Sequence, residues 1–162
     1  MVVWELVASS GRNKLSGFFE RRSHNGAGNA IIVANITIAG EFWRRDSQKY
    51  GNELHADFEV RLLQVILTAS LVDDFVERLE QLADSPTEIS VDLADKYDND
   101  QSFSLSFGPS EKAISTKDKP VATIRYAGTA FGYGEWWFVV DQSCIRIFVE
   151  GLRKGLQAFS YN

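Results

Sequence analysis

The sequence predicts an α+β fold, a curved, mostly antiparallel β-sheet or sandwich with two amphipathic helices packed on it. Two observations predict it. Strand-like runs pass into helical patterns twice, within residues 53–83 and 135–159, where the hydrophobic period changes from about 2 to about 3.6 residues. Residues 87–140 also hold four short alternating runs, a pattern typical of adjacent antiparallel strands.

Length, composition and charge limit the kinds of protein this chain can be. The 162 residues, 44% of them hydrophobic, suffice for one domain, 1–162, whose core needs no disulfide or metal. The net charge of -5 argues against nucleic acid as a partner, because phosphate contacts require clustered Lys and Arg. The single cysteine, Cys144, fits a reducing cytoplasm. We find no signal peptide and no apolar run near the roughly 18 residues of a membrane span, so we expect a cytoplasmic protein that does not bind membranes.

The first part of the chain is predicted to consist of strands. We expect three of them, at residues 2–8, 17–22 and 30–39. Polar, glycine-containing segments are expected to join them, at 9–16 and 23–29. We expect Gly40 to end the third strand and residues 41–51 to form a charged, exposed connector.

The next run, residues 53–68, contains a change of buried face. Phe58 and Leu62 share one parity, whereas Val65 and Leu67 share the other. A strand cannot exchange its buried face without a bulge or a bend. We therefore predict a bulge at residues 61–63.

Two helices are predicted at about 70–84 and 142–159. Ser70 is the expected N-cap of the first, and Asp141 or Ser143 that of the second. The first helix carries one apolar stripe, made of Val72, Phe75, Val76, Leu79, Leu82 and Ala83. Gly151 and Gly155 lie four residues apart in the second helix, a spacing that arises either from close approach to a neighbour or by chance.

Four strands are expected between the helices, at residues 88–93, 101–107, 120–127 and 135–140. The acidic segment 95–100 is expected to be a solvated turn, because it lacks the glycine and the glutamate of a calcium-binding loop. Residues 108–119 are expected to form a loop, and the glycine-rich residues 128–134 a hairpin loop.

One group of residues is a candidate ligand-binding site. Glu53, His55 and Asp57 share one strand parity, so a histidine lies between two carboxylates on one surface. Such a group can bind a ligand or act as an acid and base, and Tyr133 and Glu135 are the residues we expect to complete it. The alternative is the polar outer face of a half-buried strand. We expect no metal and no cofactor.

A second group is a candidate partner-binding site. Trp43, Arg44 and Arg45 lie in the predicted connector, and Trp and Arg are enriched among the residues that dominate protein interfaces. The alternative is that Trp43 covers a sheet edge. Trp136 and Trp137 are adjacent in a strand, so one of them must point to each face.

Residues 42–159 resemble the WapI family of bacterial immunity proteins and its uncharacterised relatives. The resemblance lies in hydrophobic patterns, in residues 70–79 after the strand that ends at Ala69, in the alternating residues 103–107, and in the final strand that passes through Asp141 into residues 145–159. It implies a non-catalytic protein that binds and blocks a secreted toxin, and it transfers no functional residues.

We therefore expect a non-catalytic cytoplasmic binding protein, of immunity type, that blocks a toxin by surface complementarity. Its acidic charge suits a basic protein partner such as a toxin. The alternative is a small-ligand-binding domain or an enzyme that uses the face of Glu53, His55 and Asp57. The sequence does not indicate the oligomeric state.

Overall fold

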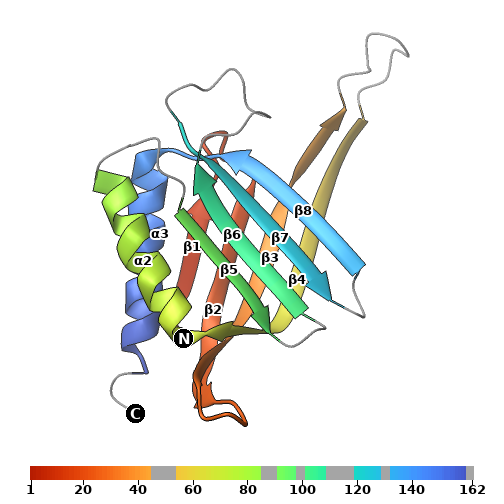
Figure 1. The fold of residues 1–162 in the computed structure, drawn as a ribbon. Helices are drawn as coiled ribbons and strands as arrows, with labels where there is room; N and C mark the ends of the chain where they lie inside the picture. Colours follow the sequence, from red (N-terminus) through yellow and green to blue (C-terminus); the bar gives the residue numbers. More distant parts are fainter. Residues whose placement is uncertain (45–53, 85–90, 98–100, 109–118, 129–131, 160–162) are drawn as a thin grey trace.

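The fold was obtained as a computed structural model, which describes residues 1–44, 54–84, 91–97, 101–108, 119–128 and 132–159 (Figure 1). Two four-stranded antiparallel sheets face each other, and two helices lie together along one side of them (Figure 1). The predicted α+β fold is thus confirmed, as a sandwich with its helices packed beside β1 and β5. No helix among the described residues is long and apolar enough to cross a membrane.

The first sheet contains the strands of the N-terminal part of the chain, in the order β1 (Val3–Val7), β2 (Lys14–His24), β3 (Ala30–Arg44) and β4 (Leu54–Thr68). β2 begins three residues before the predicted start at Gly17, because Lys14 pairs with both Val7 and Ala39. β3 continues through Gly40, where we had predicted its end. A side chain at that position would meet Asn13 Oδ1, which instead accepts a hydrogen bond from Glu41 N at 3.3 Å.

The predicted bulge in β4 is present and lies at Leu63 and Gln64, overlapping the end of the predicted range. Both residues lie opposite Asn35, since Ala34 pairs with Val65 and Ile36 with Leu62, and Gln64 adopts a φ of 56°. Asn35 holds the bulge, because its Oδ1 accepts a hydrogen bond from Gln64 N at 3.0 Å. The extra residue returns Val65 to the inner face, where it is buried beside Leu62.

The second sheet has the order β5 (Val91–Tyr97), β6 (Gln101–Gly108), β7 (Val121–Gly128) and β8 (Gly132–Val139). Its strands run further than predicted, because β5 includes Asp95 while β7 and β8 extend into the predicted hairpin loop. Asp95 is buried, which corrects the prediction of a solvated turn at this residue. Its carboxylate accepts a hydrogen bond from Thr68 N and so ties β5 to the end of β4.

The helices are α2 (Ala69–Asp84) and α3 (Gln142–Gln157). All six residues of the predicted stripe of α2 are buried, although the helix includes Ser70 and begins one residue earlier than the cap we predicted there. Asp141 is the N-cap of α3 but makes no side-chain capping bond; it pairs with Lys119 at 2.7 Å. Arg153 of α3 pairs with Glu80 of α2, which holds the helices side by side.

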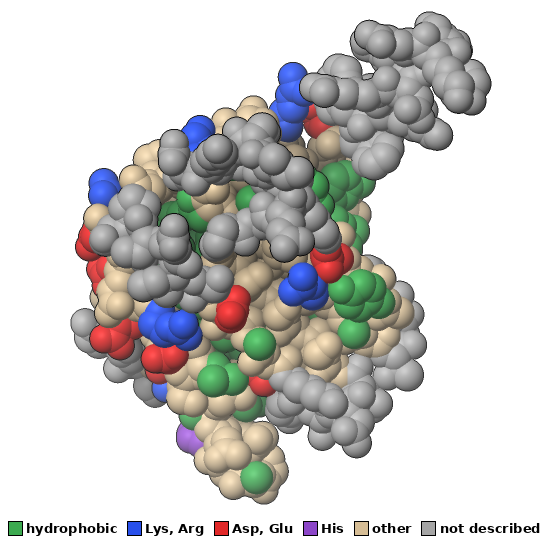
Figure 2. All heavy atoms as spheres, turned by 45° about the horizontal axis from the view of Figure 1, so that its top comes forward, with side chains coloured by type: hydrophobic (Ala, Val, Ile, Leu, Met, Phe, Trp, Pro, Cys, Tyr) green, Lys and Arg blue, Asp and Glu red, His purple; other side chains and the backbone are tan. Residues whose placement is uncertain are grey.

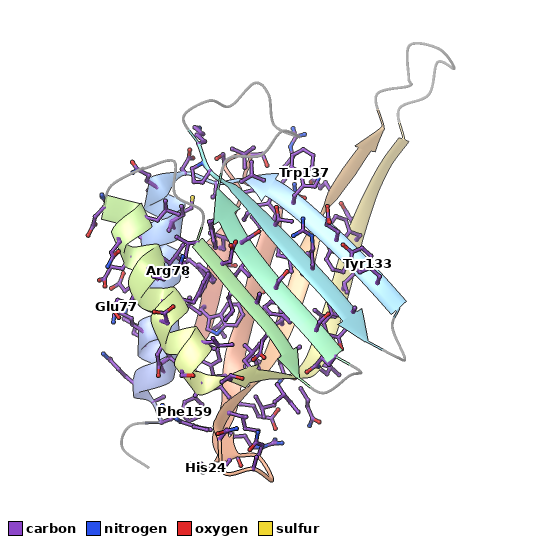
Figure 3. The ribbon with its side chains drawn as sticks, viewed as in Figure 1. His24, Glu77, Arg78, Tyr133, Trp137 and Phe159 are labelled. Atoms are coloured by element: carbon purple, nitrogen blue, oxygen red, sulfur yellow. The ribbon has the colours of Figure 1, made fainter. Side chains whose placement is uncertain are left out.

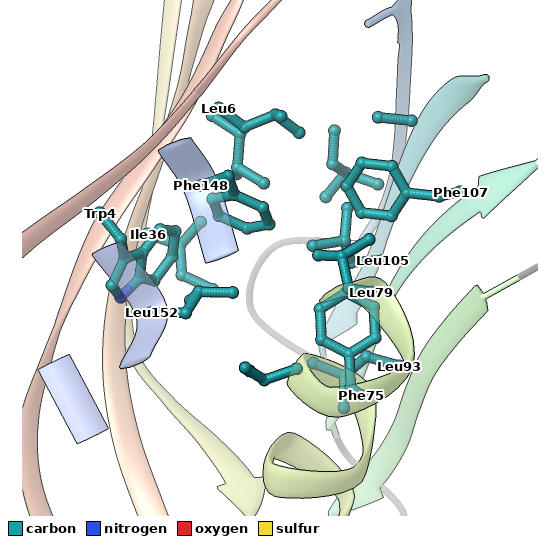
Figure 4. Packing of buried hydrophobic residues seen from close by; sticks show 14 of the residues in the cluster. Trp4, Leu6, Ile36, Phe75, Leu79, Leu93, Leu105, Phe107, Phe148 and Leu152 are labelled. Carbon is teal, nitrogen blue, oxygen red and sulfur yellow. The ribbon is translucent and has the colours of Figure 1, made fainter. Parts of the chain in front are cut away.

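One hydrophobic core fills the space between the sheets and the helices (Figure 4). Phe148 of α3 lies at its centre, with ring centroids 5.8 Å from Trp4 and 6.2 Å from Phe107. The two glycines of α3 permit the close approach that we had weighed against chance. A Cβ at Gly151 would lie 3.0 Å from Trp4 Cβ, and one at Gly155 would lie 3.0 Å from Phe19 Cδ2.

Candidate functional site

A hollow of about 700 Å³ lies beside the turn between β1 and β2. β3 and β4 continue past this turn (Figure 1). Six charged side chains line it: Glu5, Arg12, Lys14, Glu41, Asp57 and Glu59. We call it the acidic hollow, because four carboxylates face two cations. Its small or apolar lining residues are Val7, Gly11, Ala39, Gly40 and Phe58. The volume is within the range of roughly 300–1,000 Å³ that ligand sites occupy.

Alternation along the strands places these charges on one surface. In the register of the first sheet, Val7, Lys14, Ala39 and Glu59 form one row across all four strands. The next row on the same face, two residues further along each strand, contains Glu5 and Arg61. These residues have the parity opposite to the buried core residues, so they form the outer face of the sheet.

Ion pairs within the acidic hollow involve exposed or half-exposed side chains. Lys14 Nζ lies 2.7 Å from Glu5 Oε1, and Arg12 Nε lies 3.7 Å from Glu41 Oε2. Glu59 pairs at 2.6 Å with Arg61, just outside the hollow. Exposed ion pairs contribute only about 0–1 kcal/mol each, so an incoming cation can replace one of these partners at little cost.

Of the predicted ligand-binding residues, the structure describes the side chains of Asp57, Tyr133 and Glu135. Asp57 is exposed and lines the acidic hollow, on the parity predicted for it. His55 lies in β4, where its backbone pairs with Trp43 of β3; its side chain lies outside the described part of the structure, as does the whole of Glu53. Tyr133 and Glu135 belong to β8 of the other sheet, because the two halves of the chain form separate sheets.

The predicted partner-binding residues are placed only in part. Trp43 and Arg44 are the last residues of β3, so this part of the predicted connector is in fact strand. Pairing with β4 provides the backbone hydrogen bonds that a polar connector would lack. Arg45 and the side chains of Trp43 and Arg44 lie outside the described residues. Their role in binding a partner therefore stays a prediction.

The outer face of the second sheet carries a polar network beside two exposed aromatic side chains. Glu135 Oε2 accepts hydrogen bonds from Arg125 Nε at 2.8 Å and from Tyr133 OH at 3.1 Å. The hydrogen bond to Glu135 raises the pKa of Arg125. Trp137 is 43% exposed and lies on the same face as Tyr133, which is 67% exposed (Figure 3). Trp136, by contrast, packs against the core, so the predicted division of the two tryptophans between the faces is confirmed.

Figure 2 shows part of this surface, where charged side chains of both signs intermix and hydrophobic side chains gather only in small groups. In the described part of the chain, no group of three or more His, Cys, Asp or Glu side chains could hold a metal ion. His24 lies at the end of β2, far from Tyr133 and Trp137 (Figure 3). Cys144 is half-buried in the first turn of α3.

Sequence reasoning missed most of the acidic hollow. Glu5, Arg12 and Lys14 come from β1, β2 and the turn between them, far in sequence from Asp57. The sequence showed that Glu59 and Arg61 lie on the same face of a strand. It did not show which strand would pair beside them. Searches of protein-family models, curated proteins and solved structures gave no match to this chain.

Proposed function

We propose that this protein is a non-catalytic binding protein that holds a basic protein partner against the acidic hollow. By this proposal it acts in the cytoplasm, as an immunity protein that blocks a toxin by covering it. The main support for the proposal is the acidic hollow, whose four carboxylates and two cations lie where β3 and β4 begin to extend beyond β1 and β2. The net charge of -5 supports it, because an acidic surface steers a basic partner into contact.

The chemistry of the acidic hollow suits Lys and Arg side chains of a partner. A basic side chain that enters the acidic hollow can pair with Asp57 or Glu59. Its aliphatic stem can lie against Val7 and Ala39, whose side chains are small and apolar. The strands β3 and β4 extend beyond the hollow toward Trp43, the predicted anchor (Figure 1). A protein that contacts the hollow can therefore also contact this extension.

The test compares two double charge reversals that change the net charge equally. Asp57→Lys with Glu59→Lys alters the acidic hollow, whereas Asp73→Lys with Glu77→Lys alters the exposed face of α2. Calorimetric titration with a dodecalysine peptide at low salt should give at least about tenfold weaker binding for the first variant and less than about threefold for the second. Equal losses in both variants would show that only net charge matters and would contradict the proposed site.

The immunity role itself is tested with the basic protein encoded beside this gene, where there is one. Coexpression should restore growth to cells that produce that protein, and the reversal at Asp57 and Glu59 should abolish the rescue while the α2 reversal preserves it. Rescue that survives reversal of the hollow would place the binding surface elsewhere. No rescue by the wild-type chain would contradict the toxin-blocking role.

The second candidate is a small-ligand-binding domain, favoured by the volume of the acidic hollow and by the presence of Asp57 in it. Its ligand would be a small organic cation, for which a polyamine is a suitable probe. Saturable polyamine binding that is lost on reversal of Asp57 and Glu59, without binding of dodecalysine or a basic protein, would favour this candidate over the first.

A further inference from the structure

The bulge in β4 turns a leucine side chain into solvent. Leu63 is 71% exposed, although the residues on either side of the bulge, Leu62 and Val65, are buried. Apart from Met1, it is the most exposed large hydrophobic side chain in the described part of the chain. Gln64 beside it has a φ of 56°, in the left-handed region that residues other than glycine rarely adopt. Bulges and strained residues of this kind are frequent beside functional sites, so Leu63 is a candidate contact for a partner.

Side chains of the two neighbouring strands hold this bulge in place. Asn35 Oδ1 accepts a hydrogen bond from Gln64 N, and Asn35 Nδ2 donates one to Glu20 Oε2 at 3.0 Å. Glu20 lies at a second irregularity, because the pairing of β2 with β3 shifts between Phe19 and Arg21. Arg21 Nη1 in turn donates to Glu20 Oε1 at 2.8 Å. Leu63 therefore projects from a backbone that is fixed by hydrogen bonds across three strands.

Leu63 lies at one end of a row of residues that crosses the first sheet. The register aligns Val3, Phe18 and Asn35 across β1, β2 and β3, and the bulge of β4 lies opposite Asn35. This row has the parity of the outer face, opposite to that of the buried core residues. Val3 is 56% exposed and Phe18 is half-buried. We call Val3, Phe18 and Leu63 the apolar row.

The apolar row and the acidic hollow lie on the same face of the same sheet. Glu59 of the hollow and Leu63 are four residues apart along β4, a separation of about 13 Å in a strand. The row between them contains Ser16, Thr37 and Arg61, and Arg61 is paired with Glu59. A surface that lies on this face therefore meets carboxylates at one end and apolar side chains at the other.

We propose that the apolar row belongs to the surface that binds the basic partner, and that this partner presents apolar side chains about 13 Å from its Lys or Arg side chains. The inference rests on the proposed function and describes its partner further. Interfaces combine an apolar centre with polar and charged groups around it. The apolar row provides the first and the acidic hollow provides the second, so a partner that carries charge alone uses only part of this face.

Other exposed hydrophobic side chains of the described residues lie elsewhere on the molecule. Tyr133 and Trp137 belong to the second sheet, and Leu71 and Ile147 belong to the helices α2 and α3. None of these four shares a face with the acidic hollow, so nothing connects them to the same partner. Leu71 and Ile147 are therefore suitable control positions for the apolar row.

Two synthetic peptides separate the apolar contact from the charge. Both begin with six lysines and two glycines; one then ends in Leu-Trp-Leu and the other in Ser-Ser-Ser. In an extended peptide the last lysine and the tryptophan lie about 13 Å apart, which matches the separation of Glu59 and Leu63 along β4. Calorimetric titration of the wild-type chain at low salt should show at least about tenfold tighter binding of the peptide with the apolar end.

Two double variants locate the contact. Val3→Ser with Leu63→Ser should reduce the gain from the apolar end to less than about threefold and leave binding of the serine-ended peptide unchanged. The control, Leu71→Ser with Ile147→Ser, should keep the full gain, and circular dichroism shows whether both variants are folded. A gain that persists without Val3 and Leu63, or no gain in the wild type while the serine-ended peptide still binds, would overturn the apolar row and leave the proposed function intact. Failure of both peptides to bind the wild type would contradict the proposed function itself and this inference with it.

Discussion

Replacing the two glycines of α3 with alanine should affect stability unequally, although the two substitutions are chemically identical. In a helix, Gly→Ala gains about 1 kcal/mol from propensity at either position. At Gly151 the new Cβ would meet Trp4 Cβ at 3.0 Å and Trp4 Cα at 3.1 Å, so α3 must move away from the backbone of β1. Overpacking of this kind costs about 1–3 kcal/mol. We therefore expect Gly151→Ala to lower the free energy of unfolding by about 1 kcal/mol.

Gly155→Ala is the matched control. Its new Cβ would lie 3.0 Å and 3.3 Å from ring atoms of Phe19, a side chain that can shift, whereas the atoms near Gly151 include backbone. We expect this variant to be as stable as the wild type within about 0.5 kcal/mol. Urea unfolding followed by circular dichroism measures both, and Gly151→Ala should lower the midpoint by about 0.5 M. Equal shifts in the two variants, or a stabilised Gly151→Ala, would refute the close contact between α3 and β1.

Two further predictions concern carboxylates that hold strands and loops in place. Asp95→Ala should destabilise the fold by about 1–3 kcal/mol in urea unfolding, because it leaves the Thr68 N–H unpaired, and Asp95→Asn should lose less because it keeps an acceptor. The hydrogen bond from Lys119 lowers the pKa of Asp141, so this pair stabilises the fold above about pH 4 and its contribution disappears as pH falls through the lowered pKa. Lys119→Met should remove that part of the acid dependence of the thermal midpoint, and an unchanged profile between about pH 2 and pH 5 would contradict it.

Local patterns in the sequence were sufficient for the interior of most elements. The apolar stripe of α2 is buried as predicted, because residues three and four apart share a face of any helix. The change of parity before Val65 predicted the bulge in β4, because one buried face admits only one parity. Element ends were less predictable. Gly40 and Asp95 lie in strands although neither was predicted there. Asn13 lies beside Gly40, and the carboxylate of Asp95 accepts a hydrogen bond from Thr68 N; no local sequence pattern records such contacts between distant elements.

The candidate site was predictable only in its parts. Alternation placed Asp57 and Glu59 on one outer face, and the structure confirms that placement. Alternation could not indicate that Lys14 would lie in the same row of the sheet as Glu59, or that Tyr133 would belong to another sheet. Strand pairing depends on long-range packing, so two runs with the same polarity pattern can join the same sheet or opposite ones.

The sequence by itself determined the fold class and the residues that form the core. It did so because hydrophobic period fixes which side chains must leave water, whatever their partners are. The tertiary structure alone decided which strands are neighbours and where β3 and β4 pass beyond β1 and β2 to form the acidic hollow. Those features depend on contacts between residues far apart in the chain, whose energies no single segment contains.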